Sequence, residues 1–431
     1  MKRDYLSPVS APPAIRATMA KIADREDRKL PVYDFGSGNA GRLPGKFNLF
    51  TKLDIEVNKD LPESLHTIAE SLKEGLIKSF NPIPTALSYS PTGGIPSTRK
   101  LALKYFKDIH GIPLTNVELD RVIVTAGGQQ ALVASLKSLR KGTPILMLRW
   151  DYDAASGTVR SMNSKEIRVN VRDDLSIDMS DLEKKERKNS VFYLSMPNNP
   201  TGYTSPSDLK DIVELMTEHD GAVIWDAPYL FTILRMSSKK AIYDDEFLKS
   251  KQEEFKKISR KYYEHMCVLS SLSKTCLISG LRFGMATACP QWIESINTFV
   301  GRDNLSSPTG SLILGTAVLR RFLEKPLTHT WTCKILANRL TILMEELDGY
   351  LMLPTNKIFG ALYSLVKTPM DGDKFSTKLI DKYGIVTIPG SAFYGEPINV
   401  VRLSLVALPW SEGDERWIEN VRELKKALKS N

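Results

Sequence analysis

One lysine, Lys274, is the residue of this 431-residue chain whose surroundings are best suited to covalent chemistry. It follows an apolar run, 266–269, which predicts a buried strand. Ser271 and Ser273 precede it closely, and Arg282 follows it. Lysine amines form Schiff bases with carbonyl compounds, and hydroxyl and guanidinium groups can hold a phosphate. The stretch predicts a site for a phosphorylated carbonyl compound.

A second phosphate-binding signal lies where the predicted strand 121–125 meets the predicted helix 129–139. The connection is Gly127-Gly128-Gln129-Gln130. Free N–H groups at the start of a helix attract anions, and glycine allows the anion to approach. Taken alone, a Gly-Gly pair is most often an ordinary turn.

Three further segments place polar or aromatic side chains after predicted strands. Tyr152 follows the strand 145–148 and could stack on a planar heterocycle. Asn199, in Asn199-Pro200-Thr201-Gly202, follows the strand 191–194 and could donate to a ring oxygen, although the same residues also make a turn. Asp226 ends the apolar strand 222–225, with Tyr229 three residues later. A desolvated carboxylate needs a partner, and a protonated pyridine nitrogen would be one.

The elements that must position these side chains alternate between short apolar strands and amphipathic helices over 120–288. A second predicted helix, 209–219, is started by Ser205-Pro206. Such alternation predicts a three-layer α/β/α domain with a mostly parallel sheet. Ligands of these sheets bind beyond the carboxyl ends of the strands, where the candidate residues fall.

The pattern changes after about residue 323. A helix over 332–347, alternating segments near 361–366, 385–388 and 400–405, and a last helix over 412–428 predict a smaller α+β domain. We therefore expect a large domain at 61–322, a small domain at 323–431, and an N-terminal segment, 1–60, packed with the small one. The charged segment 237–261 is either a docking or lid helix or, as its apolar spacing favours, a covering helix.

The composition is that of an ordinary soluble globular protein, and we expect it to be cytoplasmic. The net charge of +9 is spread along the chain, so an anionic ligand explains it as well as a nucleic acid does. The four cysteines have no metal-binding or disulfide-dense spacing, and neither a signal peptide nor a membrane span is expected. None of the five histidines lies in the motifs above, so we predict no metal site and disfavour a Ser-His-Asp or metal-dependent hydrolase.

Over nearly its whole length the chain resembles the fold-type I, pyridoxal-phosphate-dependent aminotransferases of class I/II. The resemblance rests on motifs that occur in the order the family has them: Tyr89-Ser90-Pro91-Thr92-Gly93-Gly94, Gly127-Gly128-Gln129, Tyr152, Asn199-Pro200-Thr201-Gly202, Asp226 with Tyr229, Ser271 to Lys274 with Arg282, and Val401-Arg402-Leu403. The chain departs from the family at Asp151, near a position where proline is usual.

The resemblance implies a role for each matching residue. Lys274 is the residue that links covalently to pyridoxal 5'-phosphate and later acts as general base, and Asp226 keeps the pyridine nitrogen protonated. Asn199 and Tyr229 bond the ring oxygen, and Tyr152 stacks on the ring. Gly128, Gln129, Ser271 and Arg282 hold the phosphate, with Tyr89 reaching it from the partner of a homodimer. Arg402 binds the substrate carboxylate, and Gly38 is the loosest match, lining the carboxylate site.

The reaction implied is transfer of an amino group from an L-amino acid to a 2-oxo acid such as 2-oxoglutarate. The Asp-x-Pro-Tyr form of the motif at Asp226 resembles the subgroup that acts on aromatic amino acids, kynurenine or 2-aminoadipate. The same lysine and aspartate also serve β-lyases, racemases and decarboxylases, so those reactions stay open. A non-catalytic regulator is the remote alternative, because the aminotransferase-like pattern begins within the first forty residues and leaves no room for a DNA-binding module.

Overall fold

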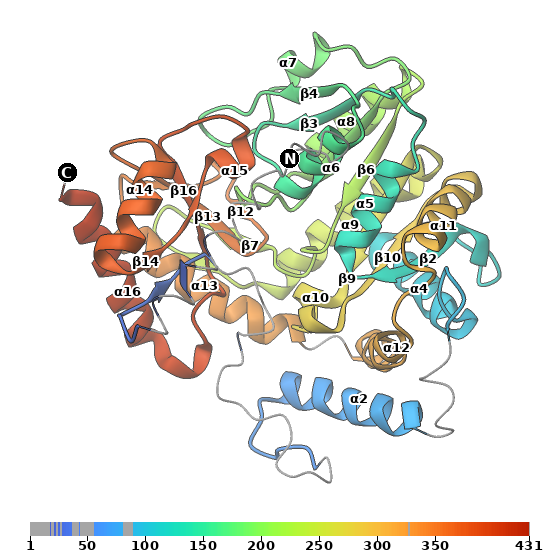
Figure 1. The fold of residues 1–431 in the computed structure, drawn as a ribbon, viewed down its shortest axis with the longest axis horizontal. Helices are drawn as coiled ribbons and strands as arrows, with labels where there is room; N and C mark the ends of the chain where they lie inside the picture. The colour runs from blue at the N-terminus through green and yellow to red at the C-terminus, as the bar shows by residue number, and fades with distance from the viewer. Residues whose placement is uncertain are drawn as a thin grey trace, which may run out of the picture.

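A seven-stranded sheet stands at the centre of the computed structural model, which describes residues 18, 21–22, 25, 28–36, 43, 56–80, 89–325 and 328–430 (Figure 1). Its strands, in spatial order, are β2 (Val122–Ala126), β10 (Phe283–Thr287), β9 (Met266–Ser271), β6 (Ala222–Asp226), β5 (Val191–Ser195), β3 (Ile145–Leu148) and β4 (Glu166–Val169). β10 is antiparallel to both of its neighbours, and the remaining neighbouring pairs are parallel. The predicted mostly parallel sheet is confirmed.

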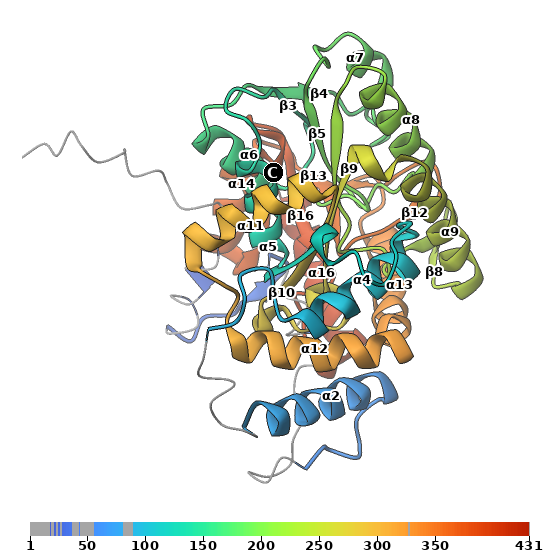
Figure 2. The same cartoon turned by 90° about the vertical axis from the view of Figure 1, so that its right-hand side faces the viewer.

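Helices cover both faces of this sheet, as Figure 2 shows. One face carries α5 (Gly128–Lys137), α6 (Asp153–Ser161) and α11 (Pro290–Asn304), and the other carries α4 (Pro96–His110), α8 (Pro206–Thr217) and α9 (Asp245–Tyr262). Successive strand residues point to opposite faces. On β6, Ile224 packs in the core under α5 and α6, while Val223 and Trp225 pack in the core on the opposite face, under α9. Both faces are therefore buried, which explains why the strands are continuously apolar.

The strands and helices named from the sequence were placed to within a few residues. β3 matches its predicted bounds, β9 continues to Ser271, and α5 begins at Gly128 rather than at Gln129. Ser205 caps α8, since its side chain accepts a hydrogen bond from the Asp208 N–H. Two strands of the sheet, β4 and β10, were not predicted.

The charged segment 237–261 contains α9, and its covering role is confirmed. Leu248, Phe255 and Ile258 are buried, and Phe255 stacks on Trp225 of β6 with ring centroids 5.2 Å apart. Its charged residues lie on the remaining face, among them Lys249 and Asp245 in an exposed ion pair. The segment is an ordinary amphipathic layer over the sheet.

A second, smaller sheet follows in the C-terminal part of the chain, beside the first in Figure 1. Its strand order is β11 (Leu351–Met352), β13 (Tyr363–Lys367), β16 (Val400–Ser404) and β15 (Ile388–Pro389). The helices of this part are α13 (Thr328–Glu346), α14 (Gly372–Lys378), α15 (Ser391–Tyr394) and α16 (Gly413–Lys429). This mixture of helices and antiparallel strands is the predicted α+β pattern.

The N-terminal part contacts both regions. β1 (Tyr33–Asp34) pairs in parallel with β14 (Ile385–Val386) of the C-terminal part, and α2 (Glu63–Phe80) lies along α12 (Thr309–Glu324) of the large one (Figures 1 and 2). From the β1–β14 pairing we propose that segment 1–60 belongs with the small domain, 323–431, and that 61–322 forms the large domain.

The remaining elements are short: α7 (Met179–Glu183), α10 (Leu272–Thr275), β7 (Leu234–Met236), β8 (Ala241–Ile242) and β12 (Ile358–Phe359), the last three forming a separate sheet. Among the described residues, no helix has both the length and the apolar composition that crossing a bilayer requires.

Candidate active site

The carboxyl ends of adjacent parallel strands bring the predicted residues to one edge of the sheet. Ser195 at the end of β5 lies in register with Asp226 at the end of β6, and Asp226 in turn lies beside Leu269 of β9. The loop after β5 carries Asn199, and the short helix α10 after β9 carries Lys274. The register of the sheet thus gathers residues that are far apart in the sequence.

The start of α5 forms a cradle suited to a phosphate. Gly127 is its N-cap, in the left-handed region at φ 82°, and no side chain of the described residues caps this helix. A Cβ added at Gly127 would lie 2.6 Å from the Arg282 guanidinium, and one added at Gly128 would lie 3.2 Å from the Ser271 side chain. Backbone N–H groups, a guanidinium and a serine therefore converge where only glycine leaves room.

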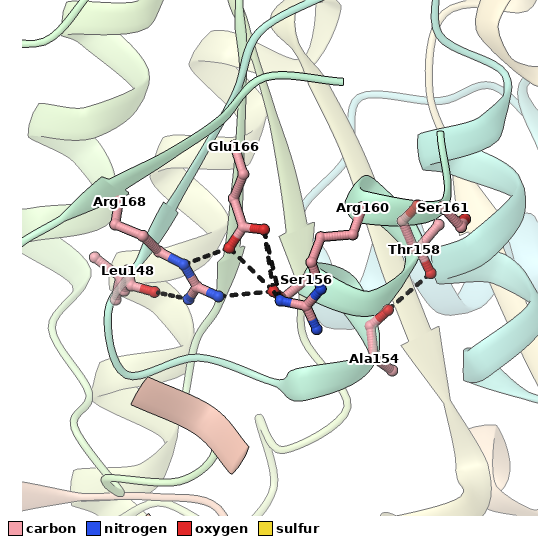
Figure 3. Close-up of polar contacts among 8 residues, drawn as sticks. All are labelled: Leu148, Ala154, Ser156, Thr158, Arg160, Ser161, Glu166 and Arg168. Atoms are coloured by element: carbon pink, nitrogen blue, oxygen red, sulfur yellow. Dashed lines mark hydrogen bonds and ion pairs between the residues drawn. The ribbon is translucent and has the colours of Figure 1, made fainter. Parts of the chain in front are cut away.

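Tyr152 lies at this edge because α6 begins directly after it. Its hydroxyl donates to Oε1 of Gln129 at 2.9 Å, which ties it to the start of α5. α6 is fixed in turn to the edge strand β4 through Ser156, as Figure 3 shows. The Ser156 hydroxyl donates to Glu166 at 3.0 Å and accepts from Arg168 at 2.8 Å. This network holds the helix, and hence the ring, in place.

Asp226 is the carboxylate nearest the centre of the site. Its Oδ2 accepts a hydrogen bond from the Tyr193 hydroxyl at 2.9 Å. Burial raises the pKa of Asp226 to about 6, although the hydrogen bond from Tyr193 opposes the shift. A carboxyl group in such surroundings gains most from a cationic partner, which a protonated pyridine nitrogen would provide.

A second buried carboxyl group, Asp151, lies behind the first. It is 1% exposed and accepts hydrogen bonds from the Ser195 hydroxyl at 2.5 Å and the Tyr152 N–H at 2.8 Å. Burial raises the pKa of Asp151 to about 8, and the charge of Asp226 adds to the shift despite those bonds. The sequence had marked Asp151 only as a departure from the family, without a structural role.

Arg402 is a buried guanidinium on β16, 1% exposed. Nη1 donates to Oδ1 of Asn199 and Nη2 to the Gly36 carbonyl, both at 3.1 Å, while Nε has no partner among the described residues. Nor does any described carboxylate lie within ion-pair distance of it. Burial lowers the pKa of Arg402, while the tyrosines Tyr363 and Tyr229 raise it. A buried cation without a carboxylate suits an anionic ligand.

Tyr363 is a site residue that the sequence analysis missed. Its ring lies under the Arg402 guanidinium, with Cζ 4.0 Å from the ring centroid, and edge-on to the Tyr229 ring at 6.1 Å between centroids. Its hydroxyl lies within interaction distance of Tyr229 and of Lys274. Tyr363 thus connects Lys274, Tyr229 and Arg402. A lone tyrosine in a predicted strand, 361–366, carried no signal that could have identified it.

Two predicted residues have a different standing. Tyr89 is 84% exposed, a position compatible with a role toward a partner subunit, and Gly38 lies outside the described residues. A dicarboxylate substrate would need a second arginine for its side-chain carboxylate. Arg149 forms an ion pair with Glu396, and Arg302 is exposed near the end of α11. Within the described ranges, no group of three or more His, Cys, Asp or Glu residues is arranged to hold a metal ion.

Comparison with known proteins agrees with this geometry. The family model described as aminotransferase class I and II matches residues 51–420. The chain is 25% identical over 395 residues to an aspartate aminotransferase of Pyrococcus horikoshii, covering 89% of this chain and 93% of the relative. It is 24% identical over 385 residues to an aromatic-amino-acid aminotransferase of Thermococcus litoralis, covering 87% and 90%. A mutant of Thermus thermophilus aspartate aminotransferase has the same fold, with a TM-score of 0.78 at 20% identity over 99% of this chain and 100% of that one.

The fold and the site define a fold-type I enzyme that works with pyridoxal phosphate. The chain belongs to the aminotransferase class I and II family and is a pyridoxal-phosphate-dependent aminotransferase. The residues present fit this cofactor: the glycine cradle at α5 suits its phosphate, and the partly buried Asp226 suits its ring nitrogen.

Proposed function

We propose that this aminotransferase moves the amino group of an L-amino acid with an aromatic, kynurenine-like or 2-aminoadipate-like side chain to a 2-oxo acid such as 2-oxoglutarate. The observation that carries the proposal is the chain of contacts from Arg402 through Tyr363 to Lys274. This chain of contacts supports the proposal, because a substrate bound by its carboxylate at Arg402 would lie on the side of the site that holds the lysine amine.

Lys274 would hold the cofactor covalently and then remove the proton from the substrate Cα. Asp226 would keep a positive charge on the ring nitrogen, and the bound cofactor supplies a ring that stabilises negative charge at Cα. Asn199 and Tyr229 would donate to the ring oxygen, and Tyr152 would pack on the ring face. Gly128, Gln129, Ser271 and Arg282 would bind the phosphate, with Arg402 binding the substrate carboxylate.

The preference for an aromatic or similarly extended side chain rests on what surrounds Arg402. The rings of Tyr363 and Phe393 lie against its guanidinium, at 4.0 and 4.7 Å from Cζ to the ring centroids. The ion pair of Arg149 with Glu396 leaves that arginine engaged elsewhere. The surroundings of Arg402 therefore favour contact with an aromatic or extended chain over the second ion pair that a short dicarboxylate requires.

We also infer a homodimer with shared active sites, located in the cytoplasm. Tyr89 supports the dimer, because a large aromatic side chain 84% exposed at the site's motif is suited to contact a second copy. The free thiols of Cys267, Cys276, Cys289 and Cys333 are in keeping with a reducing compartment. Sedimentation at several protein concentrations tests the dimer.

The substrate proposal is tested by steady-state rates of amino transfer to 2-oxoglutarate from a panel of amino acids. We expect phenylalanine, tyrosine, kynurenine and 2-aminoadipate to give higher kcat/KM values than aspartate. A clear preference for aspartate would contradict the proposed side-chain class but not amino transfer.

The rival reactions of the fold are separated by their products. A β-lyase releases ammonia and a 2-oxo acid without an acceptor, a racemase yields the D-amino acid, and a decarboxylase yields carbon dioxide. Amino transfer requires the 2-oxo acid, so product formation that stops when the acceptor is withheld favours the proposed reaction.

A further inference from the structure

Tyr363 places a phenol oxygen between two residues assigned to the chemistry. It is the first residue of β13 and lies in register with Ser404 of β16, two residues along the strand from Arg402. Residues two apart on a strand share a face, so β13 and β16 direct Tyr363 and Arg402 toward the same side. At 3% exposure the ring is closed off from solvent.

The position of the hydroxyl is set by groups on four elements. Arg402 of β16 lies over its ring, Tyr229 of the loop after β6 lies edge-on, and Lys274 of α10 hydrogen-bonds with its oxygen. Tyr152, at the start of α6, also lies close enough to interact electrostatically. Two of these four neighbours are cations: Arg402 lies over the ring face, and Lys274 lies at the phenol oxygen.

The charges around Tyr363 decide which tyrosine of the pair gives up a proton more readily. Burial alone would raise the pKa of Tyr363, but the charges of Lys274 and Arg402 and the hydrogen bonds from Tyr229 and Lys274 lower it below its ordinary value. Burial raises the pKa of Tyr229 well above the ordinary value, and its contact with Tyr363 adds to this. Since an ammonium group can only donate, the Tyr363 oxygen is the acceptor in its contact with Lys274.

We propose that Tyr363 is a positioning residue whose phenol oxygen accepts a hydrogen bond from the Lys274 amine, orients it and exchanges a proton with it. The inference rests on the proposed role of Lys274. In the exchange, the ammonium form of Lys274 gives one proton to the phenolate, leaving a neutral amine and a neutral phenol. The reverse transfer restores both charges. The neutral amine is the form that can attack a carbonyl or take a proton from the substrate Cα.

The test replaces Tyr363 by phenylalanine, which keeps the ring under Arg402 and removes only the oxygen. Tyr263→Phe is the matched control. Tyr263 is also 3% exposed and hydrogen-bonded, to Thr287 at 2.7 Å and to the Ala288 carbonyl at 2.8 Å, at the opposite edge of the sheet. Both variants therefore lose one buried hydroxyl, but only one of them loses it beside the lysine.

The first readout uses the cofactor-free protein with tyrosine labelled by carbon-13 at the ring carbon that bears the hydroxyl. We expect two tyrosine resonances to titrate below the ordinary tyrosine value of about 10, that of Tyr363 and that of the partly exposed Tyr383, because hydrogen bonds with Ser430 and Lys382 lower the pKa of Tyr383 as well. One of the two should be absent from Tyr363→Phe, and both should be retained in Tyr263→Phe. If only one resonance titrates below the ordinary range in the native protein, or if both persist in Tyr363→Phe, the proposal is wrong.

The second readout is turnover of the cofactor-loaded protein. Tyr363→Phe should lower kcat by about 10- to 100-fold, the effect of losing a hydrogen bond to a charged group, with a much smaller change in KM. An unchanged kcat overturns the proposal even if the resonance is found. If the native protein transfers no amino group at all, the proposed function fails, while the titration still reports separately on Tyr363.

Discussion

Two buried or partly buried arginines of this enzyme differ in what satisfies them. Arg168 on β4 forms an ion pair with Glu166 at 2.5 Å and donates to the Leu148 carbonyl and the Ser156 hydroxyl (Figure 3). Arg402 on β16 donates to an amide and a carbonyl, and its Nε has no partner among the described residues. The first guanidinium is neutralised by Glu166, and the second has no carboxylate partner among the described residues.

The comparison shows that burial alone does not identify a binding residue. Arg339 of α13 is also buried, donates to the carbonyls of Leu405 and Leu408 and packs over Trp417 of α16. Arg402 differs from Arg339 in its neighbours. Asn199 and Tyr363 contact Arg402 directly, and Tyr363 in turn lies beside Lys274. A buried arginine without a carboxylate partner therefore indicates a binding residue only when reactive side chains lie beside it.

The largest effect is expected when Lys274 is replaced, because this lysine lies in the candidate site with Arg402. Lys274→Ala should lower amino transfer by at least about 10²–10⁴-fold, the usual contribution of a positioned general base, and should remove the covalent link to the cofactor. Turnover and mass spectrometry after borohydride reduction measure the two losses. Lys104→Ala, which removes an exposed lysine paired with Asp108 on α4, is the control. Comparable activity in Lys274→Ala and the native protein would refute the assignment.

Arg402→Gln tests directly whether this arginine is reserved for a ligand. Loss of a charge-assisted, two-point contact should raise the KM for the amino acid by about 100-fold, while cofactor binding is retained. Saturation curves for the amino acid and a cofactor titration provide the two values. Loss of cofactor with no change in KM would place Arg402 among the cofactor ligands instead.

Arg168→Gln tests whether the arginine that is paired within the chain contributes to stability and not to substrate binding. It removes the nearer of the two ion-pair partners of Glu166 and leaves Arg160 at 3.8 Å, so the free energy of unfolding should fall by about 1–3 kcal/mol, with the KM for the amino acid unchanged. Urea denaturation and saturation curves measure the two quantities. A rise in KM as large as that of Arg402→Gln would erase the distinction between the two arginines.

A pH dependence of stability is expected at Asp151, which lies beside the candidate site rather than in it. Its pKa in the folded protein, about 8, lies above its ordinary value of 3.8, so the folded state binds the proton more tightly than the unfolded state does. Between pH 4 and 8, each rise in pH therefore costs the native protein stability. Asp151→Asn should lack this loss, and its advantage should grow up to about pH 8 and then level off. A constant difference across that range in denaturation curves would show that Asp151 is not protonated in the fold.

Much of the large domain could be predicted because its parallel strands are buried on both faces and are therefore continuously apolar. β4 escaped prediction because its sequence, with Glu166 and Arg168, is that of a polar edge strand. β10 was also missed: it begins directly after Arg282, contains Gly284, and runs antiparallel to its neighbours, outside the alternation of strands and helices. Short edge and antiparallel strands lack the pattern that identified the others.

The residues of the candidate site could also be predicted only in part. Residues such as Asn199, Asp226 and Lys274 follow strands and belong to motifs, so the sequence could name them. Tyr363 and Tyr193 lie inside strands, where tyrosine is an ordinary core residue. Their contacts with Lys274 and Asp226 come from the packing of segments far apart in the chain, and no local pattern encodes that packing.

The most direct test of the central claim is a half-reaction followed by visible absorption. The purified protein is loaded with pyridoxal phosphate, and single amino acids are added without any 2-oxo acid. We predict that aromatic amino acids, kynurenine or 2-aminoadipate bleach the absorption band of the lysine-linked cofactor, and that 2-oxoglutarate restores it. A band that forms but does not respond reversibly to any amino acid, or that turns over with release of ammonia, would contradict amino transfer at this site.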